Sequence, residues 1–224
     1  MYKIETHLHT SEVSGCGQVR AADMIKRYKA AGYDTVFVTD HFQSSSLDPM
    51  GDIPWEDKIT IFLSGYYRAK AMGDKLGVNV LPGAEFTFAG SPNHYLAYGI
   101  TREFLTDHPD VNKLTIEEFV SLARENSIFL VQAHPFRDDS CFPTPEYVDG
   151  FEVYNSNPRH NDYNDRAAAC ARENGMLITG GSDAHRPEDV ALSGVRSPFP
   201  VTSVDDYIRL LKSGQAEIME GTAK

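Results

Sequence analysis

The chain has 224 residues, with 21 Lys and Arg against 32 Asp and Glu, and its formal net charge is −11. This acidic balance argues against a protein that grips nucleic acid through a basic face, and 12 Phe and 11 Tyr argue against a disordered chain. The apolar stretches are shorter than the roughly 20 residues of a membrane-spanning helix, so we expect one folded domain over residues 1–224.

Short apolar strands alternate with amphipathic helices along the chain. The helix that follows residue 114 opens with the capping-box spacing of Thr115 and Glu118. The segment 43–55 is rich in Ser, Pro and Gly and is expected to be a loop, long enough to form a flap over a site. In chain order we expect a strand at 2–6, a helix at 21–31, a strand at 35–39, a helix at 58–76, strands at 78–81 and 95–100, a helix at 115–126, strands at 128–133 and 151–154, a helix at 162–174, a strand at 176–179, a helix at 203–213 and a strand at 216–220.

This β-α-β-α order is typical of an α/β protein with a parallel sheet or barrel, whose active residues lie at the carboxyl ends of the strands. Three cysteines (Cys16, Cys141 and Cys170) are too few and too widely spaced for a disulfide framework or a CxxC zinc pair. The first residues contain no apolar run of the kind found in a signal peptide. We therefore expect a protein of the reducing cytoplasm.

Histidine and carboxylate side chains gather where the predicted strands end. His7 and His9 are two residues apart on an extended backbone, so their imidazoles point to the same face, as a metal site requires. A second such pair, Asp183 and His185, follows the strand at 176–179. The same end of the predicted sheet also receives Asp40, His41, Glu85, His94 and His134. This donor set suits zinc, manganese or iron, whereas His108 is expected to lie at the surface and His160, which precedes a helix, is not expected to be functional.

These motifs, in this order, resemble those of the polymerase and histidinol phosphatase (PHP) family. The resemblance spans almost the whole chain from His7 to His185, and it is carried by His7-x-His9-Thr-Ser with Ser14, Thr39-Asp-His41, Pro82-Gly-x-Glu85, His94, His134-Pro and Gly181-Ser-Asp-x-His185. It implies a distorted (β/α)₇ barrel with two or three divalent metal ions at the carboxyl ends of the strands. It also implies a hydrolase that acts on phosphoric esters.

The resemblance further implies a ligand for each metal. Many relatives place a His or Asp in the loop after His9, but here the nearest ligand is Cys16, with Glu12 second. A thiolate there would favour zinc; in the alternative, Cys16 only packs and the third site is weak or empty. The implied sets are His7, His9 and Asp183 for one metal, Glu85 as a bridge to a second metal with His94 and His134, and His41, His185 and Cys16 for a third.

Hydrolysis of a phosphoester would use a water that the metals activate, and Glu85 and Asp40 are the carboxylates expected to act in catalysis. Asp40 either orients His41 or accepts a proton; in the alternative it caps the loop after its strand. Arginine matches the oxygens of a phosphate. The residues expected to bind the substrate, all near strand ends, are Arg137, Arg159, Asn155 and Arg186.

The leading hypothesis is a phosphoesterase for a small phosphorylated metabolite, such as histidinol phosphate or a nucleotide, with no extended nucleic acid and no membrane as partner. An alternative is an exonuclease-like phosphodiesterase. Hydrolysis of an amide or lactone is less favoured, because the motifs carry no lysine at a strand end that could bridge two metals. A non-catalytic metal-binding or regulatory module would need a closed site without an open position for water.

Overall fold

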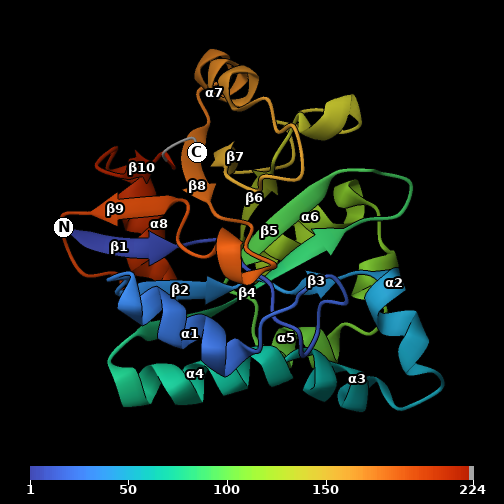
Figure 1. Ribbon diagram of the computed structural model, residues 1–224. Coiled ribbons are helices and arrows are strands. Elements are labelled where there is room, and N and C mark those ends of the chain that lie inside the picture. The colour runs from blue at the N-terminus through green and yellow to red at the C-terminus, as the bar shows by residue number, and fades with distance from the viewer. Residues whose placement is uncertain (222–224) are drawn as a thin grey trace.

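The computed structural model describes residues 1–221, which form one mixed α/β structure (Figure 1). Within this range ten strands join in a single sheet of order β10-β9-β1-β2-β4-β5-β6-β7-β8, and β3 pairs with β4 off this path. The strands are β1 (Tyr2–Glu5), β2 (Thr35–Val38), β3 (His41–Phe42), β4 (Asn79–Thr87), β5 (His94–Tyr98), β6 (Phe129–Ala133), β7 (Gly150–Asn155), β8 (Leu177–Gly181), β9 (Gly194–Ser197) and β10 (Glu217–Met219).

The helices pack around this sheet, with α1 and α4 side by side along one flank and α7 at the far end beside β7 (Figure 1). The capping box predicted for Thr115 and Glu118 is confirmed at the start of α6. The α-helices are α1 (Ala21–Ala30), α2 (Ser44–Leu47), α3 (Trp55–Phe62), α4 (Ser64–Leu76), α5 (Arg102–Asp107), α6 (Ile116–Glu125), α7 (Asn164–Glu173) and α8 (Val204–Lys212), and short 3₁₀ turns lie at Asp48–Met50, Val111–Lys113, Arg137–Asp139 and Pro187–Asp189.

The two ends of the parallel part of the sheet approach each other just beyond β1 and β8. Leu8 and Ala184 form an isolated parallel bridge, in which the His9 amide donates to the Ala184 carbonyl at 2.9 Å. The sheet is therefore a nearly closed barrel, and the predicted fold class, a distorted (β/α) barrel, is confirmed. The bridge also brings the carboxyl end of β1 next to that of β8, where the predicted ligands lie.

The barrel departs from a regular βα alternation at several strands. β5 runs antiparallel to both β4 and β6, and β9, which periodicity does not reveal, runs antiparallel to β1 and β10. Helix α5 was also missed, although Thr101 caps it by accepting a hydrogen bond from the Phe104 amide. These elements are short, and short segments carry little periodicity.

Three predicted boundaries are wrong. The single helix at 58–76 is two helices, α3 and α4, which meet at Leu63, where ψ is −4° instead of the helical value of about −42°. The expected loop at 43–55 contains α2, a 3₁₀ turn and the first residue of α3. The strand expected at 78–81 continues through Pro82 and Gly83 to Thr87, so Glu85 lies inside β4 and not in a loop after it.

The interior is filled from both sides of the barrel wall. The four residues of β2 are all buried, as their β-branched and aromatic side chains predict for a parallel strand covered on both faces. Tyr207 of α8 packs its ring 5.0 Å from that of Phe37 and 5.1 Å from that of Tyr98. Because Phe37 lies in β2 and Tyr98 in β5, α8 ties the two sides of the barrel together. This packing leaves the opposite, carboxyl end of the strands for the polar cluster.

Candidate metal centre

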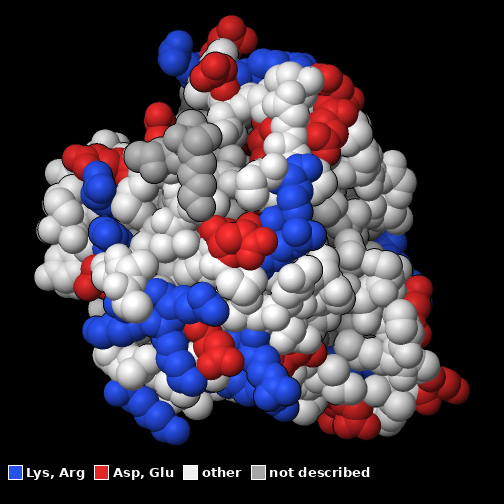
Figure 2. All heavy atoms as spheres, viewed as in Figure 1, with Lys and Arg blue, Asp and Glu red and all other residues white. Residues whose placement is uncertain are grey.

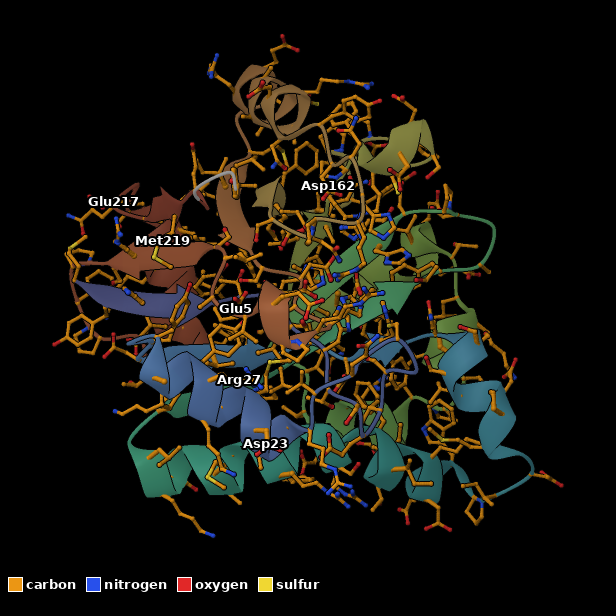
Figure 3. The ribbon with its side chains drawn as sticks, in the orientation of Figure 1. Glu5, Asp23, Arg27, Asp162, Glu217 and Met219 are labelled. Atoms are coloured by element: carbon orange, nitrogen blue, oxygen red, sulfur yellow. The ribbon has the colours of Figure 1, made fainter. Side chains whose placement is uncertain are left out.

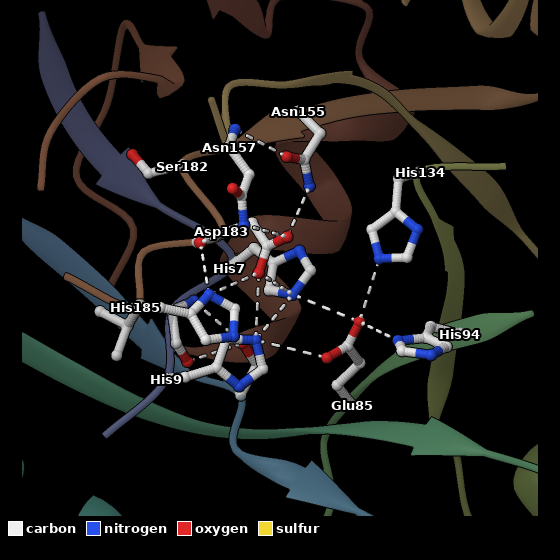
Figure 4. Close-up of polar contacts among 12 residues, drawn as sticks. His7, His9, Glu85, His94, His134, Asn155, Asn157, Ser182, Asp183 and His185 are labelled. Atoms are coloured by element: carbon white, nitrogen blue, oxygen red, sulfur yellow. Dashed lines mark hydrogen bonds and ion pairs between the residues drawn. The ribbon is translucent and has the colours of Figure 1, made fainter. Parts of the chain in front are cut away.

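Four side chains converge at the carboxyl ends of β1, β4 and β8 (Figure 4). The Nε2 atoms of His7 and His9 lie 3.1 Å apart. An oxygen of Asp183 lies 3.4 Å from the first and 3.2 Å from the second, and the oxygens of Glu85 lie 3.5 and 3.3 Å from the same two atoms. All four side chains are buried.

These spacings fit a divalent metal ion. Ligand atoms held at about 2.0–2.1 Å from a tetrahedral zinc are about 3.3–3.4 Å from each other, close to the distances that separate the His7 and His9 nitrogens from each other and from oxygens of Glu85 and Asp183. Glu85 Oε2 and His41 Nδ1, which lie 2.8 Å apart, and His134 Nδ1 are, in addition, buried atoms without a well-aligned hydrogen bond among the described residues. Buried polar atoms left in this state are costly.

Glu85 also reaches a second group of imidazoles. His94 Nδ1 lies 2.9 Å from Glu85 Oε1, and His134 Nε2 lies 3.3 Å from the same oxygen. Because Glu85 belongs to β4, its carboxylate stands between the His7–His9 pair and the His94–His134 pair (Figure 4). The structure therefore brings together the residues expected to hold two metals around one shared carboxylate.

A third group lies on the other side of His9. The rings of His41 and His185 each stack on that of His9 at 4.2 Å between centroids, and the Cys16 thiol lies near enough to both His41 and His185 for them to lower its pKa. Cys16 is at the surface of the molecule. His41 Nδ1 also lies 2.8 Å from Glu85 Oε2, so this ring borders two of the three groups. Glu12, the second candidate in the loop, instead accepts a hydrogen bond from the Ala21 amide at the start of α1.

The charges of the cluster balance one another. Burial by itself would raise the pKa of Glu85, but His94, His41 and His7 hold that pKa well below its usual value. Burial likewise acts to lower the pKa of His7, yet Asp183, Glu152 and Glu85 raise it well above the usual value. For the Cys16 thiol, burial acts to raise the pKa, but the hydrogen bonds with His185 and His41 lower it to about 6. Divalent cations bound in the cluster would compensate the same carboxylates.

Asp40 holds the loop that follows His9. Its carboxylate accepts hydrogen bonds from the backbone N–H and the hydroxyl of Thr10 and from the hydroxyl of Ser14, each at 2.7 Å. Ser14 in turn contacts Nδ1 of His9 at 3.2 Å and accepts from the His41 amide at 3.1 Å. Asp40 therefore orients the His9 imidazole and the His41 backbone through Ser14 and also anchors the loop.

The arginines expected to bind substrate are engaged by carboxylates. Arg137 donates to Asp162 at 2.6 Å and to Asp183 at 2.7 Å. Arg159 makes a two-pronged pair with Asp189 at 2.8 and 2.7 Å. Arg137 therefore contacts a carboxylate of the cluster directly, whereas Arg159 lies one step further out.

Asn155 and Arg186 also lie beside the cluster. The amide nitrogen of Asn155 donates to Glu152 at 2.9 Å and approaches Asp183 at 3.4 Å. The backbone N–H of Arg186 donates to Asp189 at 2.8 Å, the same carboxylate that accepts from the backbone N–H of His185 at 3.0 Å. Asp189 thereby fixes the turn that carries both residues.

Two buried carboxylates within strands escaped the sequence analysis. Glu152 in β7 and Glu5 in β1 are both fully buried, and Glu152 contacts His7 Nδ1 at 2.9 Å. A charged residue within an otherwise apolar strand was the signal that could have identified them, because an isolated buried charge is too costly to keep without a partner. Asn157, which donates to Asp183 at 3.2 Å, carried no such signal.

The two remaining histidines, His108 and His160, and the single tryptophan, Trp55, lie outside the cluster. His108 Nδ1 contacts the Phe104 carbonyl at 2.7 Å, and His160 pairs with Asp138 at 2.7 Å at the surface. Trp55 packs edge-on against Phe42 and donates to the Leu105 carbonyl. No helix among residues 1–221 is long and apolar enough to cross a membrane.

Comparison with known proteins identifies two family models. The PHP domain model matches residues 5–179, and a PHP-associated model matches residues 161–216. A search of curated proteins found no match.

Several solved structures share the fold. A two-domain protein from Bacteroides vulgatus, described as containing a predicted PHP-like metal-dependent phosphoesterase, superposes with a TM-score of 0.73 at 17% identity over 98% of this chain and 65% of its own. PsfC from Pseudomonas syringae gives 0.69 at 19% identity over 99% and 92%. A lesion-specific endonuclease from Pyrococcus furiosus gives 0.64 at 18% identity over 97% and 57%. The chain thus spans about two thirds or less of the first and third of these proteins.

Proposed function

The chain belongs to the PHP family of metal-dependent phosphoesterases, and on that premise we propose that it hydrolyses the phosphoric ester of a small phosphorylated metabolite. The observation that carries this proposal is the convergence of His7 Nε2 and His9 Nε2, which lie 3.1 Å apart, with oxygens of Glu85 and Asp183 that lie 3.2 to 3.5 Å from them. Imidazole nitrogens and carboxylate oxygens that meet at these distances form a typical ligand set for a divalent metal ion.

In this proposal two or three divalent ions occupy the cluster. Glu85 would serve both the first and the second site, and His41, His185 and Cys16 would hold a third ion, for which the Cys16 thiolate would favour zinc over manganese or iron. When bound, the ions would lower the pKa of a water molecule and neutralise phosphoryl charge. The remaining chemistry falls to the protein's own side chains.

Those side chains orient the ligands and bind the anion. Asp40 keeps His9 and His41 in place through Ser14. Arg137 holds Asp183 through one nitrogen of its guanidinium group, and we propose that another nitrogen of this planar group faces the phosphate. In the same proposal Asn155, Arg159 and Arg186 line the edge of the substrate site.

A second candidate function, the phosphodiesterase, is favoured by a basic groove beside the cluster. Arg20, Lys26 and Arg27 line a cavity of about 510 Å³ together with Gln18, Val19, Pro187 and Asp23, whose carboxylate pairs with Lys26 at 2.8 Å. The backbone N–H of Gln18 donates to the His185 carbonyl, so this groove adjoins the third group of ligands. Figure 2 shows Lys and Arg gathered over α1 and α4, and Figure 3 labels Asp23 and Arg27 on α1. A second phosphate of a longer substrate would fit this charge.

The test is hydrolysis of p-nitrophenyl phosphate and of its bis-ester by the purified protein with manganese or zinc. We expect the monoester to be cleaved faster, and His7→Ala and Asp183→Ala to lose both metal and activity. His108→Ala is the matched control, because this His lies outside the cluster and should change neither. No turnover at full metal content would refute the phosphoesterase and favour the non-catalytic metal module.

The ratio of the two rates separates the two candidate functions. Faster cleavage of the bis-ester would favour the phosphodiesterase, and Arg27→Ala should then slow cleavage of a dinucleotide more than that of the monoester. We also propose a cytoplasmic location, because Cys16, Cys141 and Cys170 are free thiols.

A further inference from the structure

Glu152 is a fully buried carboxylate at the centre of β7 that none of the expected metal sites uses. Both of its oxygens accept hydrogen bonds. Oε1 faces Nδ1 of His7 at 2.9 Å, while Oε2 accepts from the backbone N–H of His134 at 3.1 Å and from the side-chain amide of Asn155 at 2.9 Å. Every hydrogen-bond partner that the structure gives this carboxylate is thus a donor.

The contact with His7 decides which nitrogen of that ring is available. A neutral imidazole carries one N–H and one lone pair. With Nδ1 against a carboxylate, the proton stays on Nδ1 and the lone pair is on Nε2. Nε2 is the atom that lies 3.1 Å from His9 and 3.4 Å from Asp183. Glu152 therefore prepares the nitrogen that faces the other ligands.

The contact with His134 acts on the backbone. His134 has φ of 30°, in the left-handed region, a conformation that is strained outside glycine and persists only where the surroundings hold it. The hydrogen bond from its N–H to Glu152 supplies such a constraint. In this conformation the ring carries Nε2 to 3.3 Å from Glu85.

The local geometry of β7 places Glu152 between these two histidines. Its pairing with β8 shifts register between Glu152 and Tyr154, and such a bulge turns a side chain out of the regular alternation. Asn155 is oriented by a separate contact, because its side-chain oxygen accepts a hydrogen bond from the backbone N–H of Asn157 at 2.9 Å. The side-chain nitrogen of Asn155 is therefore left to face Glu152. The three groups that donate to Glu152 are thus His7 Nδ1, the His134 backbone N–H and the Asn155 side-chain nitrogen.

We propose that Glu152 is a positioning residue for the metal centre, which fixes the tautomer of His7 and the backbone of His134 so that both rings present Nε2 to the ions. The proposal rests on the metal site of the proposed function but not on the substrate. A glutamine cannot replace this carboxylate. Its amide nitrogen would either face Nδ1 of His7, which moves the ring proton to Nε2, or face the N–H groups of His134 and Asn155.

The test is calorimetric titration of zinc into the metal-free protein and its Glu152→Gln variant. We expect the tightest zinc to bind about 10- to 100-fold more weakly to the variant. Nitrogen-15 NMR of the histidine rings in the zinc-loaded wild-type protein should place the His7 proton on Nδ1. Both readouts are independent of turnover, so a zinc-loaded wild-type protein without hydrolytic activity would refute the proposed function and leave this inference intact.

Glu5→Gln is the matched control. Glu5, labelled in Figure 3 at the end of β1, is as deeply buried as Glu152. Its Oε1 accepts from the amides of Thr6, His7 and Ser182, and its Oε2 accepts from the Tyr28 hydroxyl at 2.7 Å. A glutamine can keep its oxygen on the three amides and donate to the Tyr28 oxygen, so zinc affinity should stay within about threefold of wild type.

Two outcomes overturn the proposal: unchanged zinc affinity in Glu152→Gln, or an equal loss in Glu5→Gln. If Glu152→Gln shows no cooperative thermal unfolding, Glu152→Asp decides instead. Aspartate keeps the charge but is one methylene too short to reach His7 and His134 together, so zinc should again bind more weakly. Zinc binding at wild-type strength in a folded Glu152→Asp protein would also refute the positioning role.

Discussion

Gly181 lies where β8 passes closest to the metal centre, and Gly181→Ala is the sharpest test of how tightly that centre is packed. A Cβ at this position would lie 2.6 Å from Cβ of His7, 2.9 Å from Oε1 of Glu152 and 3.0 Å from Oγ1 of Thr6. Carbon atoms in contact are normally about 3.5–4.0 Å apart, so the strands must separate by about 1 Å. Because Cβ of His7 is attached directly to the backbone, no rotamer change relieves this contact.

The displacement is large for a metal site, whose ligand distances tolerate only about 0.2 Å. Overpacking of this kind costs about 1–3 kcal/mol. If the cost falls on metal binding, zinc affinity drops about 5- to 150-fold, since about 1.4 kcal/mol is tenfold. The assays are zinc titration by calorimetry and thermal unfolding of the metal-free protein.

Gly180→Ala is the matched control on the same strand. Successive residues of a strand face opposite sides, and the added Cβ would meet Cγ2 of Ile218 at 2.9 Å and the carbonyl oxygen of Tyr154 at 3.0 Å, away from His7. We expect it to lower the melting temperature but to keep zinc affinity. Wild-type zinc affinity in Gly181→Ala, or an equal loss in Gly180→Ala, would refute the argument that the centre is limited by this contact.

Three further predictions concern the loop after His9 and the helix caps. Asp40→Ala leaves the buried Thr10 amide without an acceptor, which should cost about 1–3 kcal/mol; chemical denaturation measures this loss, and hydrogen exchange should show faster opening of residues 10–17. Cys16 has its pKa lowered to about 6 and is exposed, whereas burial raises the pKa of Cys141. Iodoacetamide should therefore modify Cys16 first, with a rate that rises from pH 5 to 7 as the thiolate forms and then levels off, and bound zinc should protect Cys16. Mass spectrometry after timed labelling checks both expectations. A modification rate that still climbs steeply above pH 8 would contradict the low pKa of Cys16. Thr115→Ala removes the cap of α6 and should lower stability by about 1 kcal/mol, seen as a melting temperature about 2–4 °C lower.

Residues close together in the sequence were predicted well. The His7–His9 and Asp183–His185 pairs need only the two-residue period of an extended chain, and both reach the cluster. The capping box of α6 likewise depends on Thr115 and Glu118 alone.

The course of β4 shows where local signals mislead. Pro82 and Gly83 read as a turn, yet the strand continues, because Pro82 pairs with Val38 at the very end of β2, where the lack of an N–H matters little. Beyond that point β3 replaces β2 as the partner and pairs His41 with Glu85. Glu85 therefore belongs to a strand because of a neighbour that the local sequence does not show.

The partners of the arginines show the same limit. Arg137 and Arg159 stand near strand ends, as expected, but their guanidinium groups pair with Asp162 and Asp189, which are 25 and 30 positions further along the chain. Charge and position alone do not distinguish an arginine that waits for a phosphate from one that holds a carboxylate.

The sequence by itself determined the family, the barrel class and the set of imidazole and carboxylate groups at the strand ends, since these depend on residue type and short-range spacing. Only the tertiary structure decided which imidazoles share the Glu85 carboxylate and which are contacted by further side chains such as Glu152. Glu152 and His7 are 145 positions apart in the chain and become neighbours only because the barrel nearly closes between Leu8 and Ala184. Such contacts are set by the packing of the whole sheet, and no local pattern encodes them.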